Sequence, residues 1–298
     1  MNAQKNQFIG CDKAYKDAHV VVFGAPYDST TSFRPGTRFG PAAMRMESFG
    51  IETYSPLQDR DLVDDAQVFD AGDIELPFGA PAPALKMIER QTRRILKDGK
   101  MPFLLGGEHL VTLGSFRAVL EKHPDLVVIH FDAHADLRED YLGNPLSHAC
   151  VLRRCHDLVG DGRIFQFGIR SGTREEFQFM KDGHVTTEPF SDTTLASVVS
   201  RIEQAEQSGN RRIPVYLTID MDVLDPSEFP GTGTQEAGGF TYAQLVRDVR
   251  LVCSRLNVVA MDNVELNPGL DPTGRSTALA CKFLRECLLA RLPVGGHL

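Results

Sequence analysis

LVVIHFDAHAD, residues 126–136, is an apolar run that leads directly into polar side chains. The run does not alternate between apolar and polar residues, which is typical of a strand buried on both faces in a parallel sheet. Every second side chain of an extended chain points to the same face, so Asp132, His134 and Asp136 should converge on one cleft. Two carboxylates and an imidazole in this arrangement favour a metal site over a capping Asp and a loop histidine.

A second apolar run, IPVYLTIDMDVLD at residues 213–225, ends in the same manner. It places Asp220 and Asp222 on one strand face, where two carboxylates repel each other unless a cation lies between them. Asp225 follows the strand and is interpreted as part of a solvated acidic turn. The second strand end therefore adds carboxylates that suit the same cation site.

A third strand end, FLLGGEH at residues 103–109, contributes His109, which taken alone is better explained as a capping or core histidine. Beside the two acidic strand ends it completes a set of candidate ligands: His109, Asp132, His134, Asp136, Asp220 and Asp222. This set exceeds the needs of one ion and, with bridging carboxylates, suits two. Its excess of oxygen ligands and its lack of cysteine favour Mn²⁺ over Zn²⁺. Two ions about 3.5–4 Å apart are a common means of generating and holding a hydroxide.

Other apolar segments complete the predicted set of strands: His19–Ala25, Gln67–Ala71, Met101–Leu105, Leu126–Phe131, Arg163–Gly168, Ile213–Ile219 and Asn257–Met261. Apolar residues at helical spacing predict helices over Pro83–Lys97, Thr241–Arg255 and Arg275–Leu292. Alternating strands and helices predict a three-layer α/β domain whose ligands bind beyond the carboxyl ends of the strands. No linker or repeat interrupts the chain, so residues 1–298 are predicted to form a single catalytic domain.

The composition argues against some classes of function for this protein. The 298 residues are 42% hydrophobic and 24% charged, as in ordinary globular proteins. A net charge of −8 without a basic patch argues against nucleic-acid binding and allows attraction of a cationic substrate, although many soluble proteins are acidic. No apolar run approaches the ~18 residues that span a bilayer, so no membrane association is expected. The scattered cysteines, without a CxxC pair, are expected to be reduced in the cytoplasm.

Several motifs, taken in order, resemble those of the ureohydrolases, the family of arginases and agmatinases. They are SFRPGTRFGPAAMR (residues 32–45), GGEH (106–109), FDAHAD (131–136), TIDMDVLDPSEFPGTGT (218–234) and GRSTALACKFLRE (274–286). The resemblance covers nearly the whole chain. It implies a parallel, about eight-stranded sheet flanked by helices, and a homotrimer or homohexamer.

The resemblance also implies two Mn²⁺ ions per chain and a role for each candidate ligand. One ion would be held by His109, Asp132, Asp136 and Asp220, and the other by Asp132, His134, Asp220 and Asp222. Asp132 and Asp220 would bridge the two ions. A hydroxide held between the ions would then attack the guanidinium carbon of the substrate.

Three further residues are candidates for substrate binding and proton transfer. Glu265, in MDNVELNP, matches the family carboxylate that pairs with the guanidinium, whose planar fork of donors it suits. His148, in NPLSHACV, matches the family histidine that shuttles a proton to the departing amine. Asn144 is a candidate substrate-binding residue, whereas His156, on a predicted following helix, is interpreted as structural.

The identity of the guanidino substrate depends on residues 137–149, LREDYLGNPLSHA, which resemble the bacterial agmatinase segment. Glu139 and Asp140 would repel a substrate carboxylate, which favours agmatine, a small cation that would be cleaved to putrescine and urea. The alternatives within the family are guanidinobutyrase, guanidinopropionase and arginase. A related metal-dependent deacetylase is less favoured because the second-metal set is complete, and a catalytically inactive scaffold because no ligand is missing.

Overall fold

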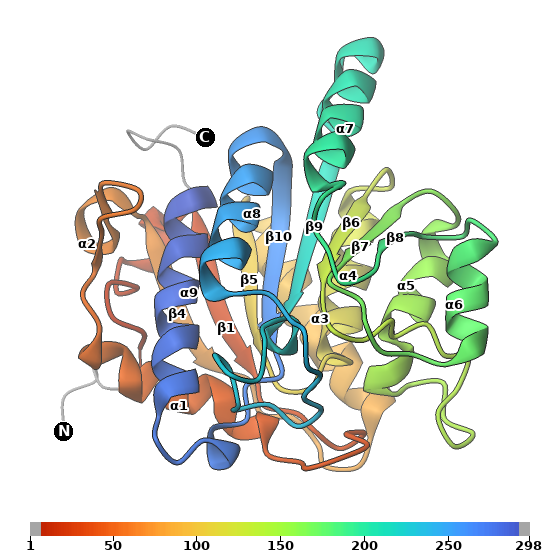
Figure 1. Cartoon of the computed structure of the whole chain (residues 1–298). Helices are drawn as coiled ribbons and strands as arrows, with labels where there is room; N and C mark the ends of the chain where they lie inside the picture. The colour runs from red at the N-terminus through yellow and green to blue at the C-terminus, as the bar shows by residue number, and fades with distance from the viewer. Residues whose placement is uncertain (1–6, 292–298) are drawn as a thin grey trace.

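The computed structural model describes residues 7–291 and places eight strands in one sheet, in the order β4-β1-β5-β10-β9-β6-β7-β8 (Figure 1). The strands are β1 (Val20–Ala25), β4 (Val68–Asp73), β5 (Met101–Gly106), β6 (Val127–Phe131), β7 (Ile164–Phe167), β8 (Thr186–Glu188), β9 (Pro214–Asp220) and β10 (Asn257–Val264). Every neighbouring pair is parallel. The predicted eight-stranded parallel α/β fold is therefore confirmed. The prediction of a single domain over 1–298 stays a prediction.

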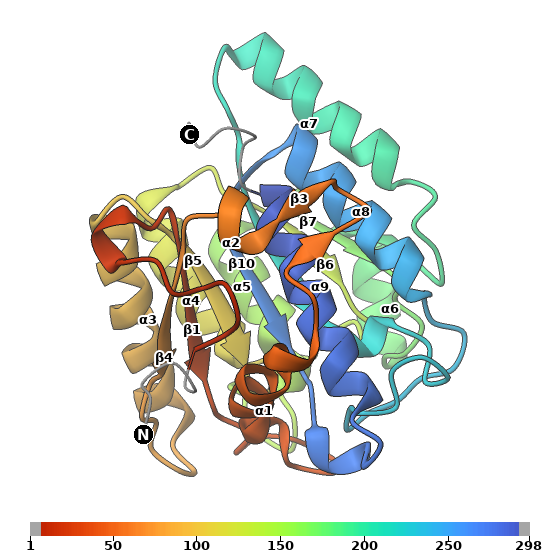
Figure 2. The same cartoon turned by 90° about the vertical axis from the view of Figure 1, so that its left-hand side faces the viewer.

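Both faces of the sheet are covered by helices, as Figures 1 and 2 show. One face packs against α1 (Gly40–Glu47), α7 (Leu195–Gly209), α8 (Tyr242–Arg255) and α9 (Arg275–Arg291), and the other against α3 (Pro81–Lys97), α4 (Val111–Lys122), α5 (Val151–Val159) and α6 (Arg174–Lys181). Along β1, Val20 and Val22 belong to one core, while Val21 and Phe23 belong to the other. Burial on both faces explains why the strands are apolar throughout.

The three predicted helices are present with small shifts at their ends. Helix α3 begins at Pro81, and α8 begins at Tyr242 because Thr241 forms a capping box with Gln244. Leu292, the predicted end of the last helix, lies outside the described residues. A short helix, α2 (Leu62–Asp65), and an antiparallel pair, β2 (Tyr54–Ser55) with β3 (Arg60–Asp61), complete the α-helices and strands of residues 7–291, and several short 3-10 helices lie between them.

Strand β8 was not predicted from the sequence. Its three residues, TTE, are polar and only partly buried, because β8 lies at the edge of the sheet and pairs with β7 alone. An edge strand of this length has no apolar run that a sequence pattern could detect.

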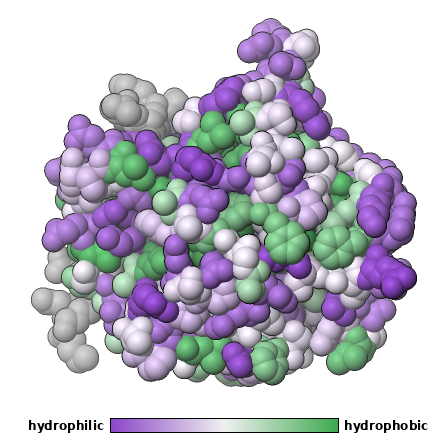
Figure 3. Space-filling model, viewed as in Figure 1, coloured by the Kyte–Doolittle hydropathy of each residue, from purple (hydrophilic) through white to green (hydrophobic). Residues whose placement is uncertain are grey.

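The visible surface is mixed in polarity. In Figure 3 the apolar residues of this face form small groups among polar ones. None of the helices within residues 7–291 combines the length and the apolar character needed to cross a membrane.

The strand order brings distant segments together at one edge. Strands β5, β10, β9 and β6 are consecutive neighbours in the middle of the sheet, although they are far apart in the sequence. Because all four are parallel, their carboxyl ends meet at the same edge. His109 follows β5, Glu265 follows β10, Asp220 ends β9 and Asp132 follows β6.

Candidate metal centre and substrate cavity

The six predicted ligands lie together at this edge of the sheet. The Nδ1 atom of His109 lies 3.1 Å from an oxygen of Asp132, 3.1 Å from one of Asp136 and 3.4 Å from one of Asp220. The Nδ1 atom of His134 lies 3.0 Å from Asp222 and 3.5 Å from Asp132. Asp132 is thus near both histidines, the place that a bridging carboxylate requires.

The proton on His109 is assigned by its hydrogen bonds. The hydroxyl of Thr218 donates to Oδ1 of Asp262 at 2.7 Å, so it accepts a hydrogen bond from Nε2–H of His109 at 2.9 Å. The buried Nδ1 atom of His109 has no hydrogen-bond partner within residues 7–291, although the three ligand carboxylates surround it. Burial opposes a charge on His109, but the carboxylates of Asp132, Asp136 and Asp220 raise its pKa well above the ordinary value. A proton therefore occupies Nδ1 when no metal is bound, and a metal ion fits the same place between Nδ1 and the carboxylates.

The carboxylates show the same need for positive charge. Burial and then the charge of Asp132 raise the pKa of Asp136 to about 7. Burial, followed by repulsion from Asp222 and Asp132, raises the pKa of Asp220 well above its ordinary value. Burial would also raise the pKa of Asp132, but the neighbouring His109, His130 and His134 hold it well below its ordinary value. Ions bound among these groups would compensate the crowded negative charge.

His130 belongs to the centre and was missed by the sequence analysis. The amide of Gln166 donates to Nδ1 of His130 at 3.0 Å, so Nε2–H of His130 donates to Asp132 at 2.8 Å. This bond orients a carboxylate that is a candidate bridging ligand. The signal was present, because His130 precedes Asp132 by two positions and so lies on the same face of the strand.

Two residues of the centre have left-handed backbone conformations, with φ of 53° at Asp136 and 67° at Glu265. Such angles cost energy in residues other than glycine, and they persist where the surrounding structure imposes them. The amide of Glu265 donates to the carbonyl of Gly107 at 3.0 Å, which joins the end of β10 to the turn after β5. These conformations direct both carboxylates toward the candidate centre.

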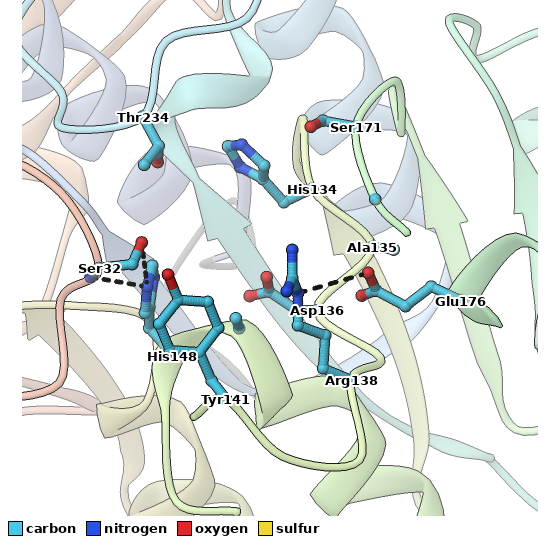
Figure 4. A pocket seen from close by; sticks show the side chains of 12 residues that line it. Ser32, His134, Ala135, Asp136, Arg138, Tyr141, His148, Ser171, Glu176 and Thr234 are labelled. Carbon is cyan, nitrogen blue, oxygen red and sulfur yellow. Dashed lines mark hydrogen bonds and ion pairs between the residues drawn. The ribbon is translucent and has the colours of Figure 1, made fainter. Parts of the chain in front are cut away.

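A cavity of about 200 Å³ adjoins the ligands (Figure 4). It is lined by Ser32, His134, Ala135, Asp136, Arg138, Tyr141, His148, Ala149, Ser171, Gly172, Glu176 and Thr234. Sites for drug-sized ligands are typically about 300–1,000 Å³, so this cavity suits a smaller molecule. Three of the predicted site residues, His134, Asp136 and His148, face it directly.

His148 is held by a loop more than a hundred residues away in the sequence. The backbone N–H of Ser32 donates to the Nε2 atom of His148 at 3.1 Å (Figure 4). A neutral ring therefore carries its proton on Nδ1, and this atom lies 3.9 Å from Glu265. The N–H of His148 donates to the hydroxyl of Thr30 at 3.1 Å. Burial, then the charges of His134 and His109, lower the pKa of His148 to about 4, so the resting ring is neutral.

Glu265 is buried beside the candidate ligand His109 and near His148. One of its oxygens accepts the backbone N–H of His109 at 2.7 Å. Burial and then the charge of Glu108 raise the pKa of Glu265 well above its ordinary value. Glu108 itself accepts hydrogen bonds from the N–H of Thr30 at 2.8 Å and from the hydroxyl of Thr31 at 3.1 Å. A cationic group near Glu265 would relieve this concentration of carboxylates.

The segment expected to choose the substrate is arranged differently from the prediction. Glu139 and Asp140 do not line the cavity, whereas Arg138 does, and its Nε atom lies 3.6 Å from Glu176. The prediction that Glu139 and Asp140 would repel a substrate carboxylate did not take Arg138 into account, and that repulsion stays a prediction. Asn144 lies in an exposed turn, where its side chain accepts the N–H of Leu146, and its role in substrate binding stays a prediction.

Comparison with known proteins agrees with the motifs. Residues 18–290 match the model of the Arginase family. The chain belongs to this family. It is 45% identical over 284 residues to the agmatinase of Bacillus anthracis, with 95% of each chain covered. It is 36% identical to the guanidinobutyrase of Pseudomonas aeruginosa, with 89% of this chain and 84% of that one covered.

The arginase-family fold is likewise seen in solved structures. The crystal structure of a Clostridium difficile protein superposes with a TM-score of 0.88 at 47% identity, covering 93% of this chain and 98% of that one. The resemblance deduced from the motifs is confirmed, and with it the assignment of the protein as an enzyme of this hydrolase family.

Proposed function

We propose that this arginase-family protein hydrolyses agmatine to putrescine and urea with two Mn²⁺ ions bound at the strand ends. The observation that carries the proposal is the buried Nδ1 atom of His109, which faces three carboxylates without a hydrogen-bond partner among the described residues. The similarity to the Bacillus anthracis agmatinase supports agmatine as the substrate.

Each ligand has a defined part in this proposal. His109 and Asp136 would hold one ion and His134 and Asp222 the other, with Asp132 and Asp220 shared between them. Thr218 and His130 keep His109 and Asp132 in orientation through the hydrogen bonds described above. When bound, the metal pair supplies a water of lowered pKa as the nucleophile for the guanidinium carbon.

Glu265 would bind the guanidinium of the substrate, and His148 would protonate the amine that departs from it. The Glu265 carboxylate, buried and close to other carboxylates, would bind the positively charged guanidinium and orient its carbon. His148, neutral at rest, would accept one proton from the hydrolytic water and give the proton on Nδ1, which faces the same side as Glu265, to the departing amine, so that the ring ends neutral again. The N–H of Ser32 keeps Nε2 as an acceptor and so favours this tautomer of the neutral ring.

Arg138 supports a second candidate substrate, 4-guanidinobutyrate. A guanidinium that lines the cavity could pair with the carboxylate of that substrate. Glu176 opposes this, since it lies 3.6 Å from Arg138 and offsets its charge. Agmatine ends in an ammonium group, which the carboxylate of Glu176 in the same lining could pair with, and it is therefore preferred.

Urea release from agmatine, 4-guanidinobutyrate, 3-guanidinopropionate and arginine, measured on Mn²⁺-loaded protein, tests the proposal. Agmatine should have the highest kcat/KM, because a carboxylate substrate must displace Glu176 from Arg138 or remain unpaired. An unpaired buried charge costs several kcal/mol, and each ~1.4 kcal/mol is a tenfold change in rate. A preference for 4-guanidinobutyrate would identify Arg138 as its partner. Release of acetate from an acetyl-lysine peptide without urea from any guanidine would favour the deacetylase-like alternative.

The metal content and the assembly are part of the same proposal. Metal analysis after loading should reach two Mn²⁺ per chain, and a plateau at one would contradict the paired centre. We also expect a cytoplasmic homotrimer or homohexamer. Light scattering coupled to size-exclusion chromatography would distinguish these two states from a monomer.

A further inference from the structure

A second group of possible metal ligands lies away from the cavity. His156 is on α5, Asp161 is in the loop that leads from α5 to β7, and His184 is in the loop that leads from α6 to β8. The Nε2 atom of His156 lies 2.8 Å from Oδ1 of Asp161, and the Nδ1 atom of His184 lies 2.9 Å from the same oxygen. Three separate segments therefore direct two imidazoles and a carboxylate to one point.

The two rings are held in orientation by an aromatic side chain. Phe179, on α6, stacks on His184 with 4.3 Å between ring centres and meets His156 edge-on at 4.9 Å. Helices α5 and α6 lie beside each other at the right of Figure 1. An ion that binds beside Asp161 would therefore find both nitrogens already directed to the same oxygen, at little cost in side-chain entropy.

The local charges permit a cation at this point. Asp161 carries a negative charge, and hydrogen bonds from His156 and His184 hold its pKa below the ordinary value. Arg153 lies on the same aromatic side chain, with its guanidinium over Phe179 at 4.4 Å. Its Nε atom lies 3.5 Å from Asp157, which offsets part of its charge.

We propose that His156, Asp161 and His184 bind one divalent transition-metal ion of the Zn²⁺ class, separately from the ions at the strand ends. Two imidazole nitrogens and a carboxylate oxygen are suitable ligands for such an ion, and water would complete a tetrahedron. This inference does not depend on the proposed substrate, and it replaces the interpretation of His156 as a structural residue.

Binding requires only a small rearrangement. Metal–ligand bonds of about 2.0–2.1 Å in a tetrahedron separate the ligand atoms by about 3.3 Å, so the hydrogen-bonded group must open by roughly 0.5 Å. Asp161 allows this because its side chain is 63% exposed. Each neutral imidazole would carry its proton on the ring nitrogen that does not face the ion.

The test compares Zn²⁺ binding by Mn²⁺-loaded wild type, Asp161→Asn, His184→Ala and, as a control, His123→Ala, which removes an imidazole elsewhere. Because Zn²⁺ also competes for the ligands at the strand ends, the measured quantity is the difference in bound zinc between proteins. Wild type and His123→Ala should bind one more equivalent than Asp161→Asn and His184→Ala. Zinc in tenfold excess over its dissociation constant should also raise their thermal midpoint by about 2–4 °C more.

The exposed Asp161→Asn change keeps the size of the side chain, so it tests the site even if His184→Ala perturbs folding. Before zinc is added, urea production should be the same in all four proteins, since none of the changed residues lines the cavity. Equal zinc stoichiometry in wild type and Asp161→Asn would overturn the proposal and leave a hydrogen-bonded group that binds no metal.

Discussion

Replacing Thr218 with valine tests whether the residues behind the centre control its affinity for metal. In the native protein the Thr218 hydroxyl accepts from His109 and donates to Asp262. Valine has a similar shape but no hydroxyl, so Nε2–H of the buried His109 loses its acceptor. Asp262 loses a donor, although it keeps the hydroxyl of Tyr216 at 2.8 Å. The ring of His109 is then free to carry its proton on Nδ1, where the proton competes with the metal.

The expected magnitude follows from these two lost bonds. An unsatisfied buried polar group costs about 1–3 kcal/mol, so Thr218→Val should lower the free energy of unfolding by about that amount or somewhat more. Loss of a hydrogen bond that orients a metal ligand typically weakens metal binding about 10–100-fold, or ~1.4–2.8 kcal/mol. The matched control is Thr218→Ser, which keeps the hydroxyl and removes one methyl group, worth about 0.8 kcal/mol of burial.

The assay is a titration of metal-free protein with Mn²⁺, followed by the signal of the free ion, alongside denaturant unfolding of the same samples. Thr218→Val should bind Mn²⁺ at least tenfold more weakly than Thr218→Ser. Equal Mn²⁺ affinity for the two variants, with only stability reduced, would refute the idea that Thr218 determines which nitrogen of His109 is free to bind metal.

Three other predictions concern single residues. Asp220→Ala should abolish urea release and lower the metal content. Asp225→Ala should keep both metals, because Asp225 accepts hydrogen bonds from the backbone N–H groups of Ser227 and Gly238 in a turn. Equal metal loss in the two variants would contradict this division of roles. Hydrogen bonds from Ser227 and the following turn hold the pKa of Asp225 at about 2, below the ordinary 3.8. The stabilisation from the ionised Asp225 side chain should therefore be complete above about pH 4 and disappear as the pH falls through 2. Unfolding measured against pH should show a weaker acid dependence for Asp225→Asn than for wild type. His148→Asn should retain both metals and lower kcat about 10²–10⁴-fold with little change in KM, and a kcat near that of wild type would rule out its role in proton transfer.

The sequence alone determined the class of fold and the set of candidate ligands. The fold class and five of the six candidate ligands rest on short-range periodicity: a run without alternation is buried on both faces, and residues two apart on a strand share a face. His109 was added only because its strand end lies beside the acidic ones. Asp132, His134 and Asp136 were found by this rule, and His130 obeys it as well. Strand β8 escaped because an edge strand is only partly buried and need not be apolar.

Other features depend on contacts that no local pattern contains. Thr218 and Asp262 lie behind His109 because β10 and β9 are neighbours in the sheet, and Ser32 reaches His148 across 116 positions of the chain. The segment after Asp136 shows most clearly what a local sequence pattern cannot predict. Its sequence is acidic, but the path of the loop turns Arg138 toward the cavity and Glu139 and Asp140 away from it.

The group of His156, Asp161 and His184 has the same origin. Its members come from a helix and two loops, and each would be ordinary in its own sequence context. Local sequence specifies which face of an element is apolar, because burial follows the period of the backbone. Which polar side chains meet is decided by the order and packing of elements that are distant in the sequence, and therefore only by the tertiary structure.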